Sequence, residues 1–373
     1  MSEAVGGLHD DVLRQVLTHF QVNNPCSVKP FGAGHVHDTF RVQDGQGTPF
    51  LLQRINHAVF RDVEGMMRNM ERVTQHLRQK ITTLSELASL TTFQLVRTND
   101  GRLFYRDEAG SCWRVLTFVA GGTAYQRTPS ATIAREAGRA FGQFSSLLRD
   151  LPGEPLVETI PQFHHLALRL TTFEQALAAN VAQHASEVQT EVAFVRQRAP
   201  ELLRLHTLID AGQFPSRITH NDTKLNNVLL DPETHRARAV VDLDTVMPGT
   251  VLHDFGDAIR TVASTAAEDE ADLRRVRFHL PYYEAFAEGY LAETSAFLTA
   301  REIKYLPLSA RYMTFIMGVR MLTDYLAGDT YYKTTYPNHN LDRARNQFWL
   351  IEQMEEQHEE MVRVVQKLIK LPE

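Results

Sequence analysis

The sequence predicts an α+β protein with a small β-rich N-terminal lobe and a larger, mostly helical C-terminal lobe. The chain has 373 residues, more than the roughly 250–300 residues that a single hydrophobic core usually serves. Short strand-like segments and turns dominate the first third. Helical spacing of apolar residues dominates the rest. We therefore expect one lobe at residues 1–120 and a second at 121–373.

Composition excludes several classes of protein. Apolar residues make up 43% and charged residues 23%, and the net charge of −6 gives no reason to expect binding to nucleic acid or a membrane surface. Only Cys26 and Cys112 are present, so neither a disulfide framework nor a cysteine-rich metal site is expected. The N-terminus lacks a signal-peptide pattern, and no apolar run is long enough to span a membrane. A reducing cytoplasm is the expected location.

The N-terminal third begins with a short amphipathic helix, expected at residues 9–20. Strand signals follow at 27–34, 39–42 and 49–55, with Gly45 and Gly47 forming a turn between the last two. Apolar residues then recur every three or four positions, which predicts a helix with one apolar face; they are Val63, Met66, Met67, Met70, Val73 and Leu77.

A second hairpin is expected from strands at 93–97 and 103–106, joined through Asn99, Asp100 and Gly101. The apolar run 113–119 closes the first lobe, and Gly121 and Gly122 follow it.

The rest of the chain is expected to be helical except for one island of strands. Helices are expected at 131–149, 164–180, 184–210, 281–298, 301–327 and 340–370. The island at 216–246 contains three predicted strands, at 217–219, 228–230 and 239–243. Between the last two, Asp231 and Pro232 begin a turn.

The candidate catalytic residues lie in this island. His220, Asp222 and Asn227 have the spacing H-x-D-x-x-x-x-N, and Asp242 follows fifteen residues later near a strand end. This is the catalytic-loop arrangement of kinases. Together with a β-rich first third and a helical remainder, it predicts a two-lobed, protein-kinase-like fold that uses ATP and Mg²⁺.

Each residue type suits phosphoryl transfer. A carboxylate, Asp222, suffices as the base because most of the catalysis is positioning. Asn227 and Asp242 offer the hard oxygen ligands that Mg²⁺ takes, and Lys224 can reach the transferred phosphoryl group. The competing interpretation is a polar loop whose side chains cap turns. Against it, five carboxylates gather here with few basic partners, which favours a cation among them; they are Asp222, Asp242, Asp244, Asp254 and Asp257.

The island also resembles the signature of the aminoglycoside phosphotransferase and choline kinase superfamily. His220, Asp222 and Asn227 match its H-x-D-x(4)-N, and Asp242 matches its metal aspartate. Several blocks are similar to the N-acetylhexosamine 1-kinases: I-T-H-N-D-T-K-L-N-N, V-D-L-D-T-V-M-P-G, H-D-F-G-D, L-L-Q-R-I-N, W-R-V and D-Y-L-A-G-D. The resemblance implies a kinase that phosphorylates the anomeric hydroxyl of a free N-acetylhexosamine.

The first lobe should bind the nucleotide. Gly32 and Gly34 lie in a loop between two strands, where glycines let the backbone approach phosphates. A plain hairpin turn also explains these glycines, and the downstream catalytic loop favours the nucleotide loop. Leu116 and Val119, in the segment that leads out of the lobe, are expected to hold adenine. His35 would contact the sugar, as the resemblance implies.

The third strand departs from the protein-kinase pattern. Protein kinases place a Lys there, paired with a Glu on the following helix. This chain has Gln53, as the hexosamine 1-kinases do, and Glu71 is the expected helix partner. The positive charge that the lysine would supply must come from another residue. Arg54 and Lys224 are the two candidates.

The C-terminal helices supply the expected acceptor site. Arg320 and Asp324 are four residues apart on one helical face, either as an internal ion pair or as substrate contacts. A guanidinium suits a neutral, oxygen-rich acceptor and would repel a cationic one. The resemblance implies that Arg320 and Tyr331 contact the sugar, and Asp244 could accept a hydrogen bond from a sugar hydroxyl. His164 and His165 are expected to be surface or lid residues.

Other functions remain open. Within the same superfamily the acceptor could be an aminoglycoside, choline, homoserine or methylthioribose. A nucleotide-binding regulator is a further alternative, although Asp222, Asn227 and Asp242 are intact. A metal-dependent hydrolase would use a different set of side chains: His35, His37, His220, Asp222, His253 and Asp254.

Overall fold

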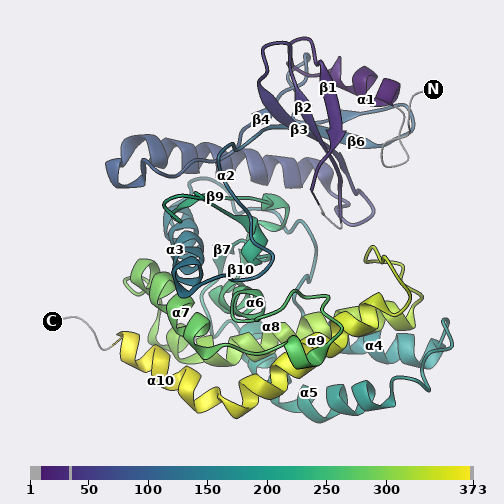
Figure 1. Cartoon of the computed structure of the whole chain (residues 1–373), viewed down its shortest axis with the longest axis vertical. Coiled ribbons are helices and arrows are strands. Elements are labelled where there is room, and N and C mark those ends of the chain that lie inside the picture. Colours follow the sequence, from purple (N-terminus) through teal and green to yellow (C-terminus); the bar gives the residue numbers. More distant parts are fainter. Residues whose placement is uncertain (1–9, 33–35, 370–373) are drawn as a thin grey trace. The chain divides into compact units, whose positions relative to one another are not determined.

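Antiparallel strands and two helices make up the first of two compact units (Figure 1). The computed structural model describes residues 10–32 and 36–369. The first unit contains the described part of Met1–Gly121 together with Gly153–Ile160 and Leu243–Val246, and the second contains the remaining described residues. The predicted α+β class is confirmed.

The sheet of the first unit has six strands. In spatial order they are β1 (Ser27–Pro30), β2 (Asp38–Gln43), β3 (Pro49–Ile55), β6 (Cys112–Thr117) and β4 (Leu95–Val96), while β5 (Tyr105–Arg106) also pairs with β6. The predicted turn between β2 and β3 is present. Gly47 has a φ of +83° and donates its N–H to the Asp44 carbonyl at 3.0 Å.

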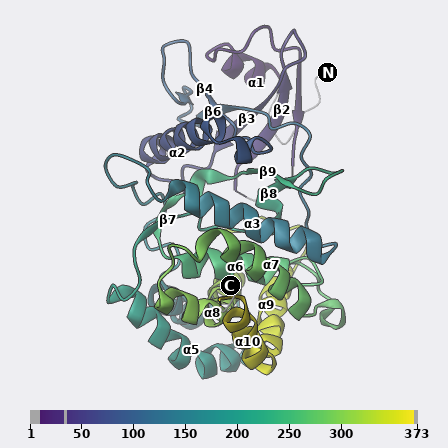
Figure 2. The same ribbon diagram turned by 90° about the vertical axis from the view of Figure 1, so that its left-hand side faces the viewer.

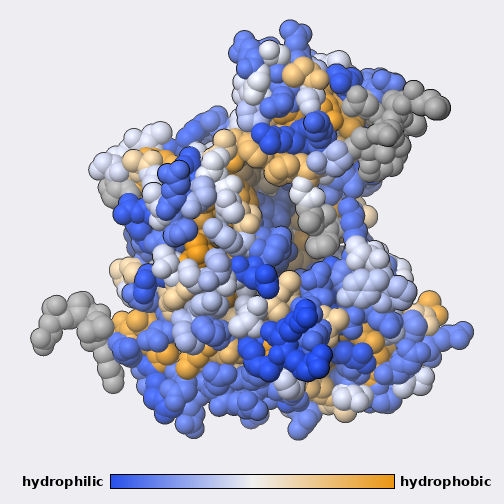
Figure 3. Space-filling model, in the orientation of Figure 1, coloured by the Kyte–Doolittle hydropathy of each residue, from blue (hydrophilic) through white to orange (hydrophobic). Residues whose placement is uncertain are grey.

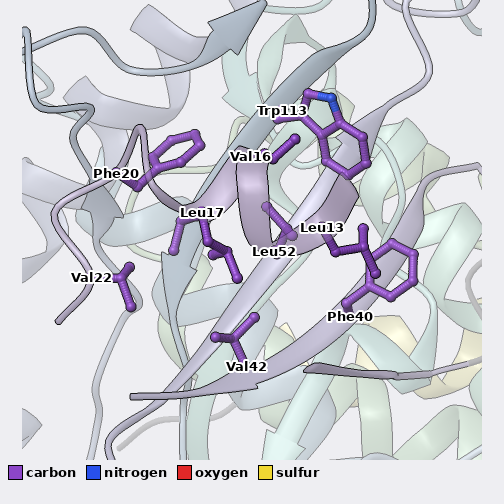
Figure 4. Close-up of a cluster of buried hydrophobic side chains, with 10 residues drawn as sticks. Leu13, Val16, Leu17, Phe20, Val22, Phe40, Val42, Leu52 and Trp113 are labelled. Carbon is purple, nitrogen blue, oxygen red and sulfur yellow. The ribbon is translucent and has the colours of Figure 1, made fainter. Parts of the chain in front are cut away.

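Two helices pack on opposite faces of this sheet. Helix α1 (Asp10–Leu17) packs against Leu52 and Trp113 within a buried cluster (Figure 4). Helix α2 (Val63–Thr83) packs against Ile55 and Cys112. Because successive side chains of a strand point to opposite faces, Arg114 lies on the α2 face of β6.

The predicted second hairpin is wrong in its pairing. The turn forms, with Gly101 N–H donating to the Thr98 carbonyl at 2.9 Å. However, β4 and β5 do not pair with each other: Leu95 and Val96 pair with one end of β6, and Tyr105 and Arg106 pair with the other. The longer, buried β6 offers both segments a better partner than either offers the other, since a lone two-stranded hairpin is marginally stable.

Two short pairs of strands form in the second unit, at and just beyond the predicted island of strands. Strand β7 (Arg217–Thr219) pairs with β10 (Met247–Gly249), and β8 (Val228–Leu230) pairs with β9 (Ala237–Val240). The third island strand thus ends at Val240, earlier than expected. Residues 243–245 form a 3₁₀ turn, η3 (Leu243–Thr245), which belongs to the first unit.

Helices complete the second unit. They are α3 (Ala131–Leu148), α4 (Leu166–Ala179), α5 (Gln189–Asp210), α6 (Val251–Val262), α7 (Leu280–Thr294), α8 (Ala300–Leu326), α9 (His339–Glu356) and α10 (His358–Ile369). Helix α8 is buried along most of its length and packs against α4, α6, α9 and α10, while α3 and α7 lie side by side (Figure 2).

Helix prediction failed at two places. Helix α6 was not predicted, although Leu252, Phe255 and Ile259 recur at helical spacing. The segment expected as one helix at 340–370 is two helices, interrupted at Gln357. Residue 9, expected to begin the first helix, and residue 370 lie outside the described residues.

No helix in the described part of the chain is long and apolar enough to cross a membrane. On the larger unit, the face visible in Figure 3 is mainly hydrophilic, with apolar residues in small separate patches.

Candidate active site

The predicted catalytic residues meet in the loop between β7 and β8. Asp222 keeps 23% of its side chain exposed, and its Oδ2 lies 3.2 Å from the Lys224 ammonium. The Asn227 amide donates to the Asp222 carbonyl at 2.8 Å and to Asp222 Oδ2 at 3.2 Å. The structure therefore brings together the proposed base, the proposed phosphoryl-binding lysine and one proposed metal ligand.

A carboxylate from α6 holds the backbone of this loop. Asp254 accepts the N–H groups of His220 and Asn221 at 2.9 and 2.7 Å. Asn221 has a φ of 62°, a conformation that non-glycine residues adopt rarely and that is common at functional sites. Burial raises the pKa of Asp254 to about 6. Through these two contacts Asp254 fixes the backbone path of the loop.

His220 joins the loop to the strand that leads to Asp242. Its Nε2 lies 2.9 Å from the Val241 carbonyl, and its Nδ1 accepts the Asp222 N–H at 3.3 Å. These contacts place the ring proton on Nε2. The side chain is fully buried and packs edge-on against Phe141 and Phe144.

Strand pairing brings Asn227 and Asp242 to neighbouring positions. Val228 pairs with Val240, and the Val241 N–H donates to the Asn227 carbonyl at 2.9 Å. Asp242 follows with a φ of 62°. Since the Asn227 NH₂ donates to Asp222, its amide oxygen is the atom left for a cation. An amide oxygen and a carboxylate fit Mg²⁺.

Charges around the loop keep Asp222 ionised. Burial alone raises the pKa of this carboxyl, but Lys224, with smaller effects from other cations, lowers it below its usual value. Burial likewise opposes the charge on Lys224, and Asp222 outweighs it and raises the lysine pKa. An ionised carboxylate is the form that a general base requires.

The expectation that the island's carboxylates have few basic partners is wrong. Asp257 accepts from Arg260 at 2.7 Å, and Arg260 also pairs with Glu268. Asp244 pairs with Arg114. Arg260 follows Asp257 by three residues, whereas Arg114 is 130 residues away from Asp244. The crowding of carboxylates in the sequence therefore overstated their repulsion.

Arg320 lies among aromatic rings and forms no ion pair with Asp324. Its guanidinium carbon is 4.8 Å from the Phe163 ring centre and 5.6 Å from that of Tyr331, and it donates to the Tyr331 hydroxyl at 3.4 Å. Burial lowers the pKa of Arg320, whereas the adjacent tyrosines and Asp222 raise it, and the net direction is upward.

Asp324 organises the segment that carries Tyr331. Its carboxylate accepts the N–H groups of Thr330, Tyr331 and Tyr332 at 2.8–2.9 Å and the Asn340 amide at 2.9 Å. It therefore positions the tyrosines that surround Arg320. Its predicted contact with substrate stays a prediction.

The expectation that His164 is a surface or lid residue is wrong. This side chain is 5% exposed, and its Nε2 lies 2.9 Å from the Asn221 carbonyl, next to Asp222. Fifty-seven residues separate the two in sequence, so no local pattern could have revealed the contact.

A second histidine group lies away from the catalytic loop. Ligand atoms of His165, His206 and Asp210 lie within 4.8 Å of one another. However, His165 Nδ1 accepts the Leu168 N–H at 3.1 Å, where it caps α4. Its proton therefore sits on Nε2, which faces Asp210 at 3.4 Å. His206 Nε2 lies 3.2 Å from the same carboxylate, so both rings face Asp210 at ion-pair distance.

The predicted nucleotide residues lie in the first unit. Gly32 has a φ of +78° and open space around it, while Gly34 and His35 lie outside the described residues. Leu116 is buried in β6, and Val119 is half-buried just beyond that strand. Their contacts with nucleotide stay predictions.

Gln53 does not pair with the helix that follows it. Its Nε2 donates to Thr39 Oγ1 at 3.0 Å, and its Oε1 accepts from Arg114 at 2.9 Å. The expected helix partner, Glu71, pairs with Arg97 instead.

Arg114 is a site residue that the sequence analysis missed. It is 1% exposed and forms a two-pronged ion pair with Asp244, which belongs to the same unit. Burial raises the pKa of Asp244, but Arg114 and, to a lesser degree, His37 hold it well below its usual range. Arg114 and Gln53 are paired in register between β6 and β3, a pairing of strands distant in sequence that local patterns do not reveal.

Comparison with known proteins identifies the family. Residues 27–290, more than half of the chain, match the model of APH, the phosphotransferase enzyme family. A microcompartment-associated aminopropanol kinase is 17% identical, with a TM-score of 0.62 over 94% of this chain and 98% of that one. An aminoglycoside phosphotransferase from Alicyclobacillus acidocaldarius is 12% identical, with a TM-score of 0.59 over 96% of each chain.

A Plasmodium vivax ethanolamine kinase is also similar, with 12% identity and a TM-score of 0.52 over 88% of this chain and 83% of that one. At these identities the solved structures show a shared fold. The family model, together with the loop around Asp222, shows that this chain is an enzyme of the APH phosphotransferase family.

Proposed function

We propose that this protein transfers the γ-phosphoryl group of ATP to the anomeric hydroxyl of a free N-acetylhexosamine and so forms a sugar 1-phosphate. The observation that carries the proposal is the arrangement of Asp222, Lys224 and Asn227 within 3.2 Å contacts in one loop. ATP, bound with Mg²⁺, supplies the phosphoryl group.

The residues of the chain have separate roles in this reaction. Asp222 accepts the proton of the acceptor hydroxyl as its oxygen attacks, and ADP leaves with the bridging oxygen. Lys224 places a positive charge where negative charge spreads over the transferred group. Asn227 and Asp242 hold the cation, while Gly32, Gln53, Leu116 and Val119 are the proposed nucleotide contacts.

The surroundings of Arg320 support a neutral, oxygen-rich acceptor. No carboxylate pairs with Arg320 among the described residues, and its neighbours are aromatic rings, the Tyr331 hydroxyl and the Met317 sulfur. A guanidinium donates hydrogen bonds to hydroxyl and carbonyl oxygens and repels cations. Aromatic rings suit the apolar faces of a sugar ring. The blocks that resemble the N-acetylhexosamine 1-kinases point to the same class.

Two alternatives have less support. Another hydroxyl acceptor, such as an aminoglycoside, choline or homoserine, fits the family equally well, and solved neighbours include aminopropanol and ethanolamine kinases. A metal-dependent hydrolase would need His220 and Asp254 as ligands, yet His220 bonds to the backbone through both ring nitrogens and Asp254 accepts two backbone N–H groups.

The test is product analysis with a panel of acceptors. The purified enzyme is incubated with Mg²⁺ and ATP plus N-acetylglucosamine, N-acetylgalactosamine, choline, ethanolamine or kanamycin, and the phosphate position is assigned by NMR. Phosphate at C1 of a hexosamine is expected. The methyl glycosides should not react, because the C1 hydroxyl is blocked.

Asp222→Asn serves as the control for a contaminating kinase, since it should remove product formation with every acceptor. Phosphate at C6, or efficient turnover of choline or kanamycin with none of the hexosamines, would overturn the acceptor assignment and leave the phosphotransferase assignment in place.

A further inference from the structure

Arg114 is a buried cation close to the position at which protein kinases carry a lysine on the third strand. This chain lacks that lysine. The third strand carries the neutral Gln53, and Arg114 lies beside it on the adjacent strand. Its Nε donates to Gln53 Oε1 at 2.9 Å. Of the two earlier candidates for the missing charge, Arg54 pairs with Asp38 at 2.6 Å, while Lys224 lies 3.2 Å from Asp222 in the catalytic loop and is assigned to the transferred phosphoryl group.

The contacts of Arg114 leave it no route to a ligand. Beyond Gln53, its Nη2 donates to Asp244 Oδ2 at 2.7 Å, and its Nη1 donates to Asp244 Oδ1. Nη1 also lies 3.9 and 3.8 Å from the sulfur atoms of Met67 and Met70 on α2. With 1% of its surface exposed, Arg114 can influence a bound nucleotide only through the side chains that it contacts, above all Asp244 and Gln53.

Asp244 is held from a second side as well. His37 Nε2 lies 3.4 Å from Asp244 Oδ2. His37 Nδ1 accepts the Asn56 N–H at 3.0 Å, so the proton of the neutral ring sits on Nε2 and points to the carboxylate. Both Asp244 oxygens therefore have donors within the first unit.

The segment that contains Asp244 is also fixed at its far end. Asn69 of α2, which is 3% exposed, donates to the Val246 carbonyl at 3.1 Å. Residues 243–246 are thus bound to the sheet through Arg114 and to α2 through Asn69. Asp242, the proposed metal ligand, directly precedes this segment, so the path of the backbone that carries its carboxylate is constrained.

We propose that Arg114 replaces the third-strand lysine as a positioning residue: it holds Asp244, and thereby sets Asp242 for the Mg²⁺ of the nucleotide. This inference rests on the proposed use of Mg²⁺ and ATP. It differs from the usual arrangement, in which the lysine contacts the phosphates itself. It also gives Asp244 a role other than contact with a sugar hydroxyl.

The rival explanation is a purely structural ion pair. Breaking a buried pair is strongly destabilising, whereas replacing both partners with apolar residues of similar volume often leaves stability unchanged. A structural pair and a positioning pair therefore predict different results once the fold is preserved.

The first test is Arg114→Lys, which keeps the charge but cannot donate to Gln53 and both Asp244 oxygens. ADP binding is measured by calorimetry with Mg²⁺ and with EDTA, without acceptor. The gain in ADP affinity that Mg²⁺ provides should fall by about tenfold or more, as for other residues that orient metal ligands. Affinity in EDTA should stay unchanged. Arg106→Lys, at an exposed position of β5, is the matched control and should bind like wild type.

The second test pairs Arg114→Met with Asp244→Leu, so that a failure of the first variant to fold does not decide the matter. The double variant should melt near the wild-type temperature and still lose the Mg²⁺-dependent gain. A stable double variant with wild-type Mg²⁺ dependence would overturn the inference. So would an Arg114→Lys variant whose affinity falls equally in EDTA, because Arg114 would then act on the nucleotide independently of the metal, for example through Gln53.

The outcomes also separate this inference from the proposed function. Wild-type protein that binds ADP no better with Mg²⁺ than with EDTA would refute the Mg²⁺-ATP proposal, and this inference with it. Wild-type Mg²⁺ dependence that both variants retain would refute this inference alone.

Discussion

Asp222 is the residue on which the proposed chemistry depends most directly. Its carboxylate lies beside the Lys224 ammonium and the Asn227 amide, which keep it ionised and fix its direction. Replacing Asp222 by Asn preserves shape and removes the proton acceptor. Turnover should fall by about 100-fold or more, with little change in affinity for Mg²⁺-ADP. Steady-state kinetics and calorimetry check both parts.

The control for that variant is Asp11→Asn, at an exposed position of α1, which should leave turnover unchanged. Near-normal turnover in Asp222→Asn would mean that another group accepts the proton.

Two histidines near the catalytic loop, the buried His164 and the half-buried His253, make stability depend on pH. Burial, with a smaller effect from His206, lowers the pKa of His253 from 6.5 to about 3. Burial and nearby cationic groups also hold the pKa of His164 well below its usual value. Below pH 6.5 the unfolded chain takes up protons at these residues and the folded chain does not. The free energy of unfolding therefore falls as pH drops from about 6.5 toward 3.

The variant His253→Gln removes one of these groups. At neutral pH it should be less stable than wild type. Its deficit should shrink by up to roughly 2 kcal/mol by pH 5, because wild type alone then loses the His253 contribution. Urea unfolding at pH 7.5, 6 and 5 measures the difference. His57→Gln, at an exposed position, should show no such trend. A deficit for His253→Gln that does not change with pH would contradict this assignment.

Among the elements, α3 and α7 approach each other so closely that only glycine fits. A Cβ on Gly138 would lie 2.1 Å from the Phe286 carbonyl oxygen, and one on Gly289 would lie 2.0 Å from that of Arg135. Gly142, one turn along α3, is less tight, with 2.9 Å to the Tyr290 oxygen. The contact on the other side is backbone, which cannot rotate away as a side chain can.

Gly138→Ala should therefore lower the free energy of unfolding by roughly 1–3 kcal/mol, as overpacking does. Gly142→Ala should cost less, because a helical alanine regains up to about 1 kcal/mol over glycine. Urea denaturation of both variants tests this order. Equal stability of Gly138→Ala and wild type would show that the two helices can separate at no cost.

Sheet pairing illustrates what local patterns miss. The turn at residues 98–101 was predicted correctly from its residue types, yet β4 and β5 pair with β6. Turn chemistry acts over a few residues, whereas the choice of strand partner depends on every strand present. Helix α6 escaped prediction for another reason: its H-D-F-G-D run is rich in polar residues and glycine, which local propensity assigns to a loop, although the surrounding apolar spacing is helical.

For the molecule as a whole, nucleotide binding should be visible in stability. A ligand that binds only the folded state stabilises it by about 2.7 kcal/mol at one hundred times its Kd. Mg²⁺ with ADP should therefore raise the melting temperature, and EDTA should remove most of the increase, since Asn227 and Asp242 contact the nucleotide only through the cation. Thermal melts with ADP alone and Mg²⁺ alone are the controls. An equal increase in EDTA would contradict the metal roles of Asn227 and Asp242.

Local patterns in the sequence were enough to predict the α+β class, most helices and the make-up of the catalytic loop. These features depend on short-range information: apolar spacing, turn residues, and an H-x-D-x-x-x-x-N run whose members lie within eight residues. Asp222, Lys224 and Asn227 meet because one short loop carries all three. The family followed from the same residues.

Which distant side chains support that loop depends on how the chain packs in three dimensions. Arg114 and Asp244 are 130 residues apart, His164 and Asn221 are 57 apart, and Asp254 reaches His220 across 34. Burial makes such partners necessary, because a charge or polar group removed from water must find a counterpart. Which counterpart it finds depends on how the chain packs, and so the cation that accompanies Gln53 could not be read from the residues around it.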